Sequence, residues 1–215
     1  MARIPNGITG EFIGTAGNVS GYMRFGTNFL RSRRRKSTNA MTPKRLAQQQ
    51  KIKVCNDFTR PFAGRGFFTK TFPAYGSKGS GFNRATSALM NQAIVGSYPE
   101  TAVSYPLVLV SQGPLPSPVN ASAALNNEGN IVFSWTDNTG TGTAKANDKA
   151  VLVAYFPGLQ QVVFSLDAGT RAAGTAVLQV SPMRGAVAET WMGFISNDEK
   201  DAADSVYTGS VGVEL

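Results

Sequence analysis

Histidine is absent from this 215-residue chain, and cysteine occurs once, as Cys55. Without an imidazole the chain cannot build a Ser-His-Asp triad, a Cys-His dyad or a His-ligated zinc site. A single cysteine also excludes an intrachain disulfide framework and any metal site made of several thiolates. These two absences remove most enzyme classes and leave carboxylate, lysine or phosphate-loop chemistry, or no chemistry at all.

Long apolar runs are missing as well. No segment approaches the roughly 20 apolar residues that span a bilayer, and the first residues lack the apolar core of a secretory signal. We therefore expect cytoplasmic synthesis without a membrane span. If the protein acts outside a cell, we expect it to leave by lysis, for example in a virion or other particle, or by a dedicated export route.

Positive charge is plentiful but unevenly placed. The net charge is +8, yet residues 1–85 hold 16 Lys and Arg against two acids, which gives +14. Residues 86–215 hold five Lys and Arg against 11 acids, which gives −6. This asymmetry indicates a basic segment that meets a polyanion, or that meets the acidic half of a neighbouring copy.

Residues 1–41 form a glycine-rich and basic N-terminal arm. Four glycines in the 12 residues from Gly10 to Gly21 would cost a soluble helix roughly 1 kcal/mol each, so extended strands or turns with close backbone approach are favoured. The arm is too apolar for a free tail, and we expect it to pack on something else, such as another subunit. The residues expected to make this assembly contact are Phe12, Tyr22, Phe25 and Phe29.

A run of five positive charges within six residues follows the arm's last aromatic residue. Lys and Arg contacts to phosphates supply salt-sensitive, non-specific affinity, so the run is a candidate for polyanion binding. The alternatives are a solvated charge run or one that pairs with acids of a partner subunit. The residues of the run are Arg31, Arg33, Arg34, Arg35 and Lys36.

Residues 42–112 are expected to be helical or mixed. Thr42-Pro43 predicts a helix start, and a helix to about residue 58 would gather Leu46, Ile52, Cys55 and Phe58 on one apolar side. Cys55 is then a small core residue. A second helix is predicted from Ser80 to Val95, ended by Pro99. The first helix adds four cations to the polyanion-binding candidates: Lys44, Arg45, Lys51 and Lys53.

Four phenylalanines then alternate with Arg60, Arg65 and Lys70. Cations between aromatic rings suit single-stranded nucleic acid, where bases stack and phosphates meet positive charge. The alternative, which we favour, is a strand or loop whose rings fill the core or an interface. The four residues are Phe62, Phe67, Phe68 and Phe72.

The Pro-rich segment 113–118 is interpreted as a stiff linker, and residues 119–215 as one β-domain. Short apolar runs there alternate with Gly, Asn, Asp and Pro turns, which predicts a seven-stranded antiparallel β-sandwich. The whole chain is thus expected to be mainly β with a smaller α part. The predicted strands are Val119–Leu125, Asn130–Thr136, Ala150–Phe156, Gln160–Leu166, Thr175–Val180, Glu189–Ser196 and Ser205–Val213.

No arrangement of residues predicts catalysis. The loop 76–81 lacks the glycine spacing of a phosphate loop, and the oxygen ligands between Asp137 and Asp148 lack the spaced acids of an EF-hand. No carboxylate pair lies in an apolar setting that would raise a pKa. We therefore expect no catalytic residue, cofactor, metal or small-molecule substrate.

Two resemblances go beyond these patterns. Residues 115–215 resemble a fibronectin type III or immunoglobulin-like domain, with Trp135 at the place of that family's core Trp and Trp191 where its late strand begins near a Tyr. This implies a sandwich that serves as a spacer or docking surface. The chain also resembles an uncharacterised family of Bacteroidota proteins of similar length. That second likeness is carried by 17–22, the basic stretch, 42–49, 144–153 and 205–210.

These features favour a non-enzymatic structural subunit that forms homo-oligomers in a larger particle, such as a virion, phage tail or filament. Its basic segment would contact nucleic acid or acidic neighbours. An alternative is a cellular nucleic-acid-binding protein whose immunoglobulin-like domain docks a partner. A weaker alternative is an adhesive or carbohydrate-contacting module.

Overall fold

The computed structural model describes residues 10–33, 40–63, 66–75, 79–180, 183 and 185–213. The chain divides into two compact units, Met1–Thr42 and Pro43–Leu215. We call them the N-terminal unit and the body. The described residues are mainly β, with several antiparallel sheets and a few helices. None of the helices in these ranges is both long and apolar enough to cross a membrane.

The N-terminal unit contains a three-stranded antiparallel sheet in the order β1-β2-β3. The strands are β1 (Gly14–Ala16), β2 (Val19–Arg24) and β3 (Thr27–Ser32). Two-residue loops connect them, and Gly17, Phe25 and Gly26 have positive φ in these loops, as tight hairpin turns require. The expectation of strands in the glycine-rich arm is confirmed.

Close backbone approach explains one of these glycines. A Cβ atom on Gly21 would lie 2.1 Å from the carbonyl oxygen of Phe12. Only glycine therefore lets the Phe12 segment lie against β2.

The strands of the body form two larger antiparallel sheets, in the orders β10-β7-β6 and β12-β11-β8-β9. Each of the seven runs predicted after residue 118 overlaps one of these strands, although β8 and β11 begin one and two residues before the predicted starts. Ile131, Phe133 and Trp135 alternate with more exposed neighbours along β7, as the pattern predicted. The strands are β6 (Val119–Leu125), β7 (Ile131–Thr136), β8 (Lys149–Phe156), β9 (Gln161–Ser165), β10 (Thr175–Leu178), β11 (Val187–Ile195) and β12 (Val206–Gly212).

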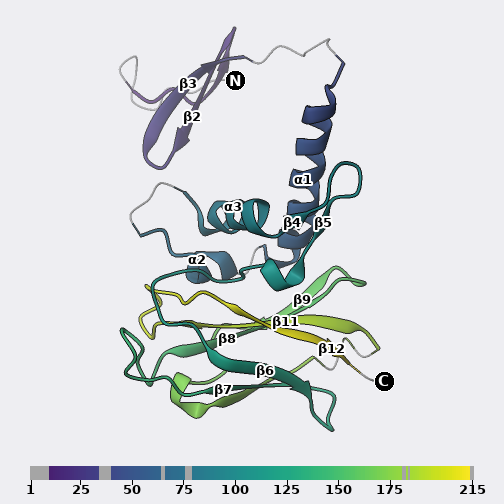
Figure 1. Cartoon of the computed structure of the whole chain (residues 1–215). Helices are drawn as coiled ribbons and strands as arrows, with labels where there is room; N and C mark the ends of the chain where they lie inside the picture. Colours follow the sequence, from purple (N-terminus) through teal and green to yellow (C-terminus); the bar gives the residue numbers. More distant parts are fainter. Residues whose placement is uncertain are drawn as a thin grey trace. The chain divides into compact units, whose positions relative to one another are not determined.

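Two hydrophobic cores hold the body together, one on each face of the four-stranded sheet. Phe133 and Trp135 pack with Leu152 and Phe194 between the two sheets. On the other face, helical residues such as Phe58 pack with strand residues such as Trp191. Figure 1 shows the helices on one side of β8 and β11, with β6 and β7 on the other. Strand β8 is buried on both faces, which explains its continuous apolar sequence.

The helices of the body are α1 (Pro43–Thr59), α2 (Phe67–Thr71) and α3 (Gly81–Gln92). Short 3₁₀ turns lie at Arg60–Phe62, Tyr105–Leu107 and Arg171–Ala173. A small sheet is formed by β4 (Ile94–Val95) and β5 (Ala102–Val103). Both predicted helices are present. Cys55 is fully buried, as predicted, and burial raises the pKa of its thiol. The prediction for Ile52 is wrong, because this side chain is exposed on α1.

The predicted linker at 113–118 does not separate two compact units. Leu115 is buried and forms a parallel bridge with Ala203, and the backbone N–H of Gly113 donates to Asp204 Oδ1 at 3.0 Å. These contacts fix the segment to the chain before β12. The boundary between compact units lies instead at residue 42.

Candidate functional site

One face of the N-terminal sheet combines exposed aromatic rings with arginines. Tyr22 on β2 lies directly opposite Phe29 on β3, and the two rings stack with centroids 5.6 Å apart and planes 19° from parallel. Because strand side chains alternate between faces, Arg24 and Arg31 project from the same face as these rings. The guanidinium carbon of Arg31 lies 5.4 Å from the Tyr22 ring centroid. We call Tyr22, Arg24, Phe29 and Arg31 the ring-and-arginine face.

The hairpin tip extends this face with a third ring. Phe25 is exposed, and the Arg24 guanidinium carbon lies 5.3 Å from its ring centroid. Its φ is +49°, a backbone conformation that large side chains rarely adopt. Asn or Asp is usual before Gly in such a turn, so the sequence retains an aromatic side chain here at a conformational cost.

The opposite face of the sheet has a different, apolar character. The Phe12 segment covers its centre at Gly21, and the Asn28 side-chain amide donates to the Phe12 carbonyl oxygen at 3.2 Å. Val19 and Leu30 share this face by register and remain 42% and 62% exposed. We call this surface the apolar face.

The predicted assembly residues thus do not all lie together. Tyr22 and Phe29 occupy the ring-and-arginine face and Phe25 its tip, whereas Phe12 packs on the apolar face. Sequence reasoning missed Arg24. The register of β2 and β3 places Arg24 on this face, and the only sequence signals for that register are the turns at Gly17-Asn18 and Phe25-Gly26, of which the second is weak.

The predicted polyanion-binding residues lie on both units. Arg31 is on the ring-and-arginine face, and Arg33 follows β3 and is exposed. Arg34, Arg35 and Lys36 lie outside the described residues.

The other four cations lie on α1 of the body. Lys44, Arg45 and Lys53 are exposed, and Lys51 is half-buried. Within the ranges that the structure describes, Lys44, Lys51 and Lys53 form no ion pair. Their ammonium groups are therefore available to an external anion.

The four phenylalanines of the body fit the core interpretation that the sequence favours, and not the base-stacking alternative. Phe62, Phe67, Phe68 and Phe72 are buried and pack on one another and on β-sheet residues. No base can stack on a ring enclosed in a core, so the core alternative describes them. Lys70, one of the interleaved cations, pairs with Glu199 at 2.7 Å.

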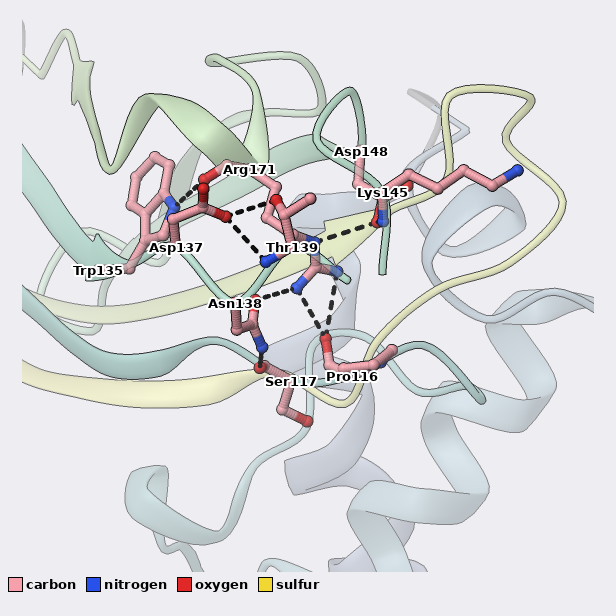
Figure 2. Close-up of polar contacts among 9 residues, drawn as sticks. All are labelled: Pro116, Ser117, Trp135, Asp137, Asn138, Thr139, Lys145, Asp148 and Arg171. Atoms are coloured by element: carbon pink, nitrogen blue, oxygen red, sulfur yellow. Dashed lines mark hydrogen bonds and ion pairs between the residues drawn. The ribbon is translucent and has the colours of Figure 1, made fainter. Parts of the chain in front are cut away.

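A buried arginine, Arg171, lies at the centre of a network of hydrogen bonds in the body (Figure 2). Arg171 is fully buried, and its Nε donates to Asp148 Oδ2 at 3.1 Å. Its terminal nitrogens donate to Asn138 Oδ1 at 2.6 Å and to the Pro116 carbonyl oxygen at 3.2 Å. The guanidinium carbon lies 3.8 Å from the Phe194 ring centroid. Burial lowers the pKa of Arg171, and the Asp148 carboxylate opposes that shift.

Several oxygen atoms of this cluster that could bind a metal ion already accept hydrogen bonds. The Asp137 carboxylate accepts from the backbone N–H and hydroxyl of Thr139, which lowers the pKa of Asp137. The Asn138 oxygen accepts from Arg171. Across the residues with described positions, no three or more Cys, Asp or Glu side chains gather into a metal-binding group. Hydrogen bonds from Arg171 to the Pro116 carbonyl oxygen and from Asn138 to the Ser117 carbonyl oxygen connect the 113–118 segment to the loops around it.

The fold and its surfaces define a β-rich body with a small basic and aromatic sheet attached. The chain belongs to the family of unknown function DUF6266, whose model matches residues 11–209. The match thus includes both the N-terminal sheet and nearly all of the body. No curated protein and no solved structure shows a detectable match to the chain.

Proposed function

We propose that this protein is a non-enzymatic subunit that assembles with copies of itself into a larger particle, such as a virion, phage tail or filament. The observation that carries the proposal is the exposed apolar face of the N-terminal sheet, with Val19 and Leu30. A three-stranded sheet of this size buries little apolar surface by itself. Exposed apolar surface next to polar residues is typical of an interaction site.

A second copy is the partner that charge favours. The N-terminal unit carries seven Lys and Arg and a single acid, whereas residues 86–215 carry −6. One copy's basic sheet is therefore electrostatically complementary to another copy's acidic half. Strand β3 is also an edge strand, and an edge offers backbone groups for pairing with another chain.

The body suits a spacer or docking role. Its three-plus-four arrangement of antiparallel strands, with Trp135 buried between the sheets, supports a β-sandwich of the fibronectin type III kind. The fourth strand pairs with the third rather than with the fifth, which differs from the constant-type immunoglobulin order. The occurrence of the family in Bacteroidota, which the sequence resemblance implies, stays a prediction.

A cellular nucleic-acid-binding protein is the second candidate function. The α1 cations Lys44, Lys51 and Lys53, which form no ion pair within the described ranges, favour it. In that case salt-sensitive nucleic-acid binding would occur on a monomer, without assembly.

Light scattering after size-exclusion chromatography tests the assembly proposal at micromolar concentration. We expect a mass well above the 22.8 kDa of one chain. Leu30→Ser and Val19→Ser each remove exposed apolar surface that assembly would bury, so the dissociation constant should rise about tenfold or more. The matched controls Leu159→Ser and Val177→Ser alter body residues that are 48% and 50% exposed, and they should leave the mass unchanged. A stable wild-type monomer contradicts the proposal.

A further inference from the structure

We propose that the ring-and-arginine face binds single-stranded nucleic acid. In this arrangement bases stack on Tyr22 and Phe29, and phosphates contact Arg24 and Arg31. The inference rests on the nucleic-acid part of the proposed function but not on assembly, which we attribute to the opposite face. It also assigns the contact to a sheet surface rather than to the Arg33–Lys36 run alone.

The ring geometry suits base stacking. Tyr22 and Phe29 are nearly parallel, 5.6 Å apart, and stay 38% and 42% exposed. Both rings are therefore partly open to solvent, and they lie side by side on one face of the sheet. A base that continues such a stack gains affinity whatever its identity, because every base has a π face.

The arginines are placed on either side of the ring pair. Arg24 is two residues from Tyr22 towards the hairpin tip, and Arg31 is two residues from Phe29 in the opposite direction. Their positions are thus about 13 Å apart along the strands, at roughly 3.3 Å per residue. A strand of nucleic acid that crosses both rings would meet a guanidinium at each end. A planar guanidinium over a ring still presents N–H groups to phosphate.

Contacts on the opposite side of the sheet support this surface. The opposite side of β2 is supported by Phe12, whose carbonyl accepts from Asn28, and by the close approach at Gly21. Supported rings lose little conformational freedom when a ligand stacks on them. Duplex DNA keeps its bases stacked within the helix, so the face fits unpaired bases rather than a duplex.

Charge favours nucleic acid over other ligands that stack on rings. The N-terminal unit contains seven Lys and Arg, and its single acid is Glu11. A neutral carbohydrate could accept hydrogen bonds from the flanking arginines, but it carries no negative charge to pair with them. A strand of nucleic acid gains from both, because counterion release accompanies each phosphate contact.

Fluorescence anisotropy with labelled dT20 and rU20 tests the inference on the full chain. We expect binding by the wild type, and Tyr22→Leu or Phe29→Leu should weaken it about fivefold or more. Leucine keeps apolar bulk and removes the π face, so this change separates stacking from simple apolar contact. Tyr22→Phe and Phe29→Tyr keep a ring and should retain the affinity.

Substitution of the arginines should change the salt dependence of binding in the same assay. Arg24→Gln and Arg31→Gln should each reduce the slope of log affinity against log salt by about 0.7, the value for one phosphate contact to a single strand. Lys145→Gln removes an exposed charge on the body, and Tyr98→Leu removes an exposed ring there. Both controls should bind like the wild type.

Two results would overturn the inference. The first is absence of binding to either oligonucleotide by the wild type. The second is binding that neither leucine variant weakens, since charge alone would then account for the affinity. If the leucine variants lower the assembled mass and leave oligonucleotide binding intact, the face is a subunit contact and the inference fails. Failure of the assembly proposal is seen separately, in the mass of the wild type.

Discussion

At the residue scale, the most consequential buried charge is Arg171. It pairs with Asp148, and the side chains of both are almost wholly buried. The second carboxylate oxygen of Asp148, Oδ1, is buried and has no hydrogen-bond donor within the described ranges. This carboxylate therefore depends on Arg171 to balance its charge.

Removing that arginine should destabilise the body strongly. Arg171→Met leaves Asp148 buried and uncompensated, so the free energy of unfolding should fall by about 3–5 kcal/mol. Urea denaturation followed by tryptophan fluorescence measures this. Lys200→Met is the matched control, because Lys200 pairs with Asp198 on the surface and such pairs contribute about 0–1 kcal/mol. Equal effects of the two substitutions would contradict the structural role of Arg171.

Tyr207 contributes to the free energy of unfolding in a way that depends on pH in the alkaline range. Burial and a hydrogen bond to Glu189 raise the pKa of Tyr207 to about 12. The unfolded value is about 10, so the folded state favours the neutral phenol. Its contribution is complete below pH 10 and is lost as the pH rises through 12. In Tyr207→Phe the free energy of unfolding should decline less over this range than in the wild type. Parallel declines in urea titrations at each pH would refute the assignment.

At the element scale, the start of α3 depends on one side chain. Ser80 precedes the helix, and its hydroxyl oxygen accepts from the backbone N–H of Asn83 at 3.3 Å. Ser80→Ala should therefore cost about 1 kcal/mol of stability. Ser87 is exposed within the same helix, where alanine is the better helix former, so Ser87→Ala should stabilise slightly. Thermal unfolding followed by circular dichroism compares the two, and a shift in the same direction for both would contradict the cap.

Elements with regular periodicity were predictable from the sequence. Alternation along β7 identified Ile131, Phe133 and Trp135 as its buried face. Turn residues marked approximately where the neighbouring strands begin and end. The short helix α2 was not predictable, because a run with Phe67 and Phe68 fits a strand or a helix equally well. Burial of these rings depends on β8 and β11, which are distant in sequence, so only the tertiary structure distinguishes core from surface.

The candidate site was predictable in part. Tyr22, Phe29 and Arg31 were identified from composition as apolar or basic members of the arm. Their placement on one face, together with Arg24, requires the register of β2 and β3. Register depends on the positive-φ turn at Phe25 and Gly26, and an aromatic residue in that turn is a weak sequence signal. The network around Arg171 joins 116, 138 and 148, and no local pattern links those positions.

At the scale of the whole molecule, charge and surface chemistry divide along the chain. The basic N-terminal unit has an apolar face and a ring-and-arginine face, whereas residues 86–215 are acidic. We propose that the first face contacts protein and the second binds nucleic acid. Substitutions on the two faces should therefore change different measured quantities, the assembled mass for the first and oligonucleotide binding for the second.

Sedimentation velocity with labelled dT20 tests that division most directly, because it reports protein mass and bound oligonucleotide in one experiment. We predict that Leu30→Ser lowers the assembled mass towards 22.8 kDa while oligonucleotide still co-sediments with the protein. Phe29→Leu should keep the assembled mass and lower the fraction of oligonucleotide that co-sediments with the protein. A wild-type chain that sediments as a monomer without bound oligonucleotide would contradict the account, as would two variants that lose both properties together.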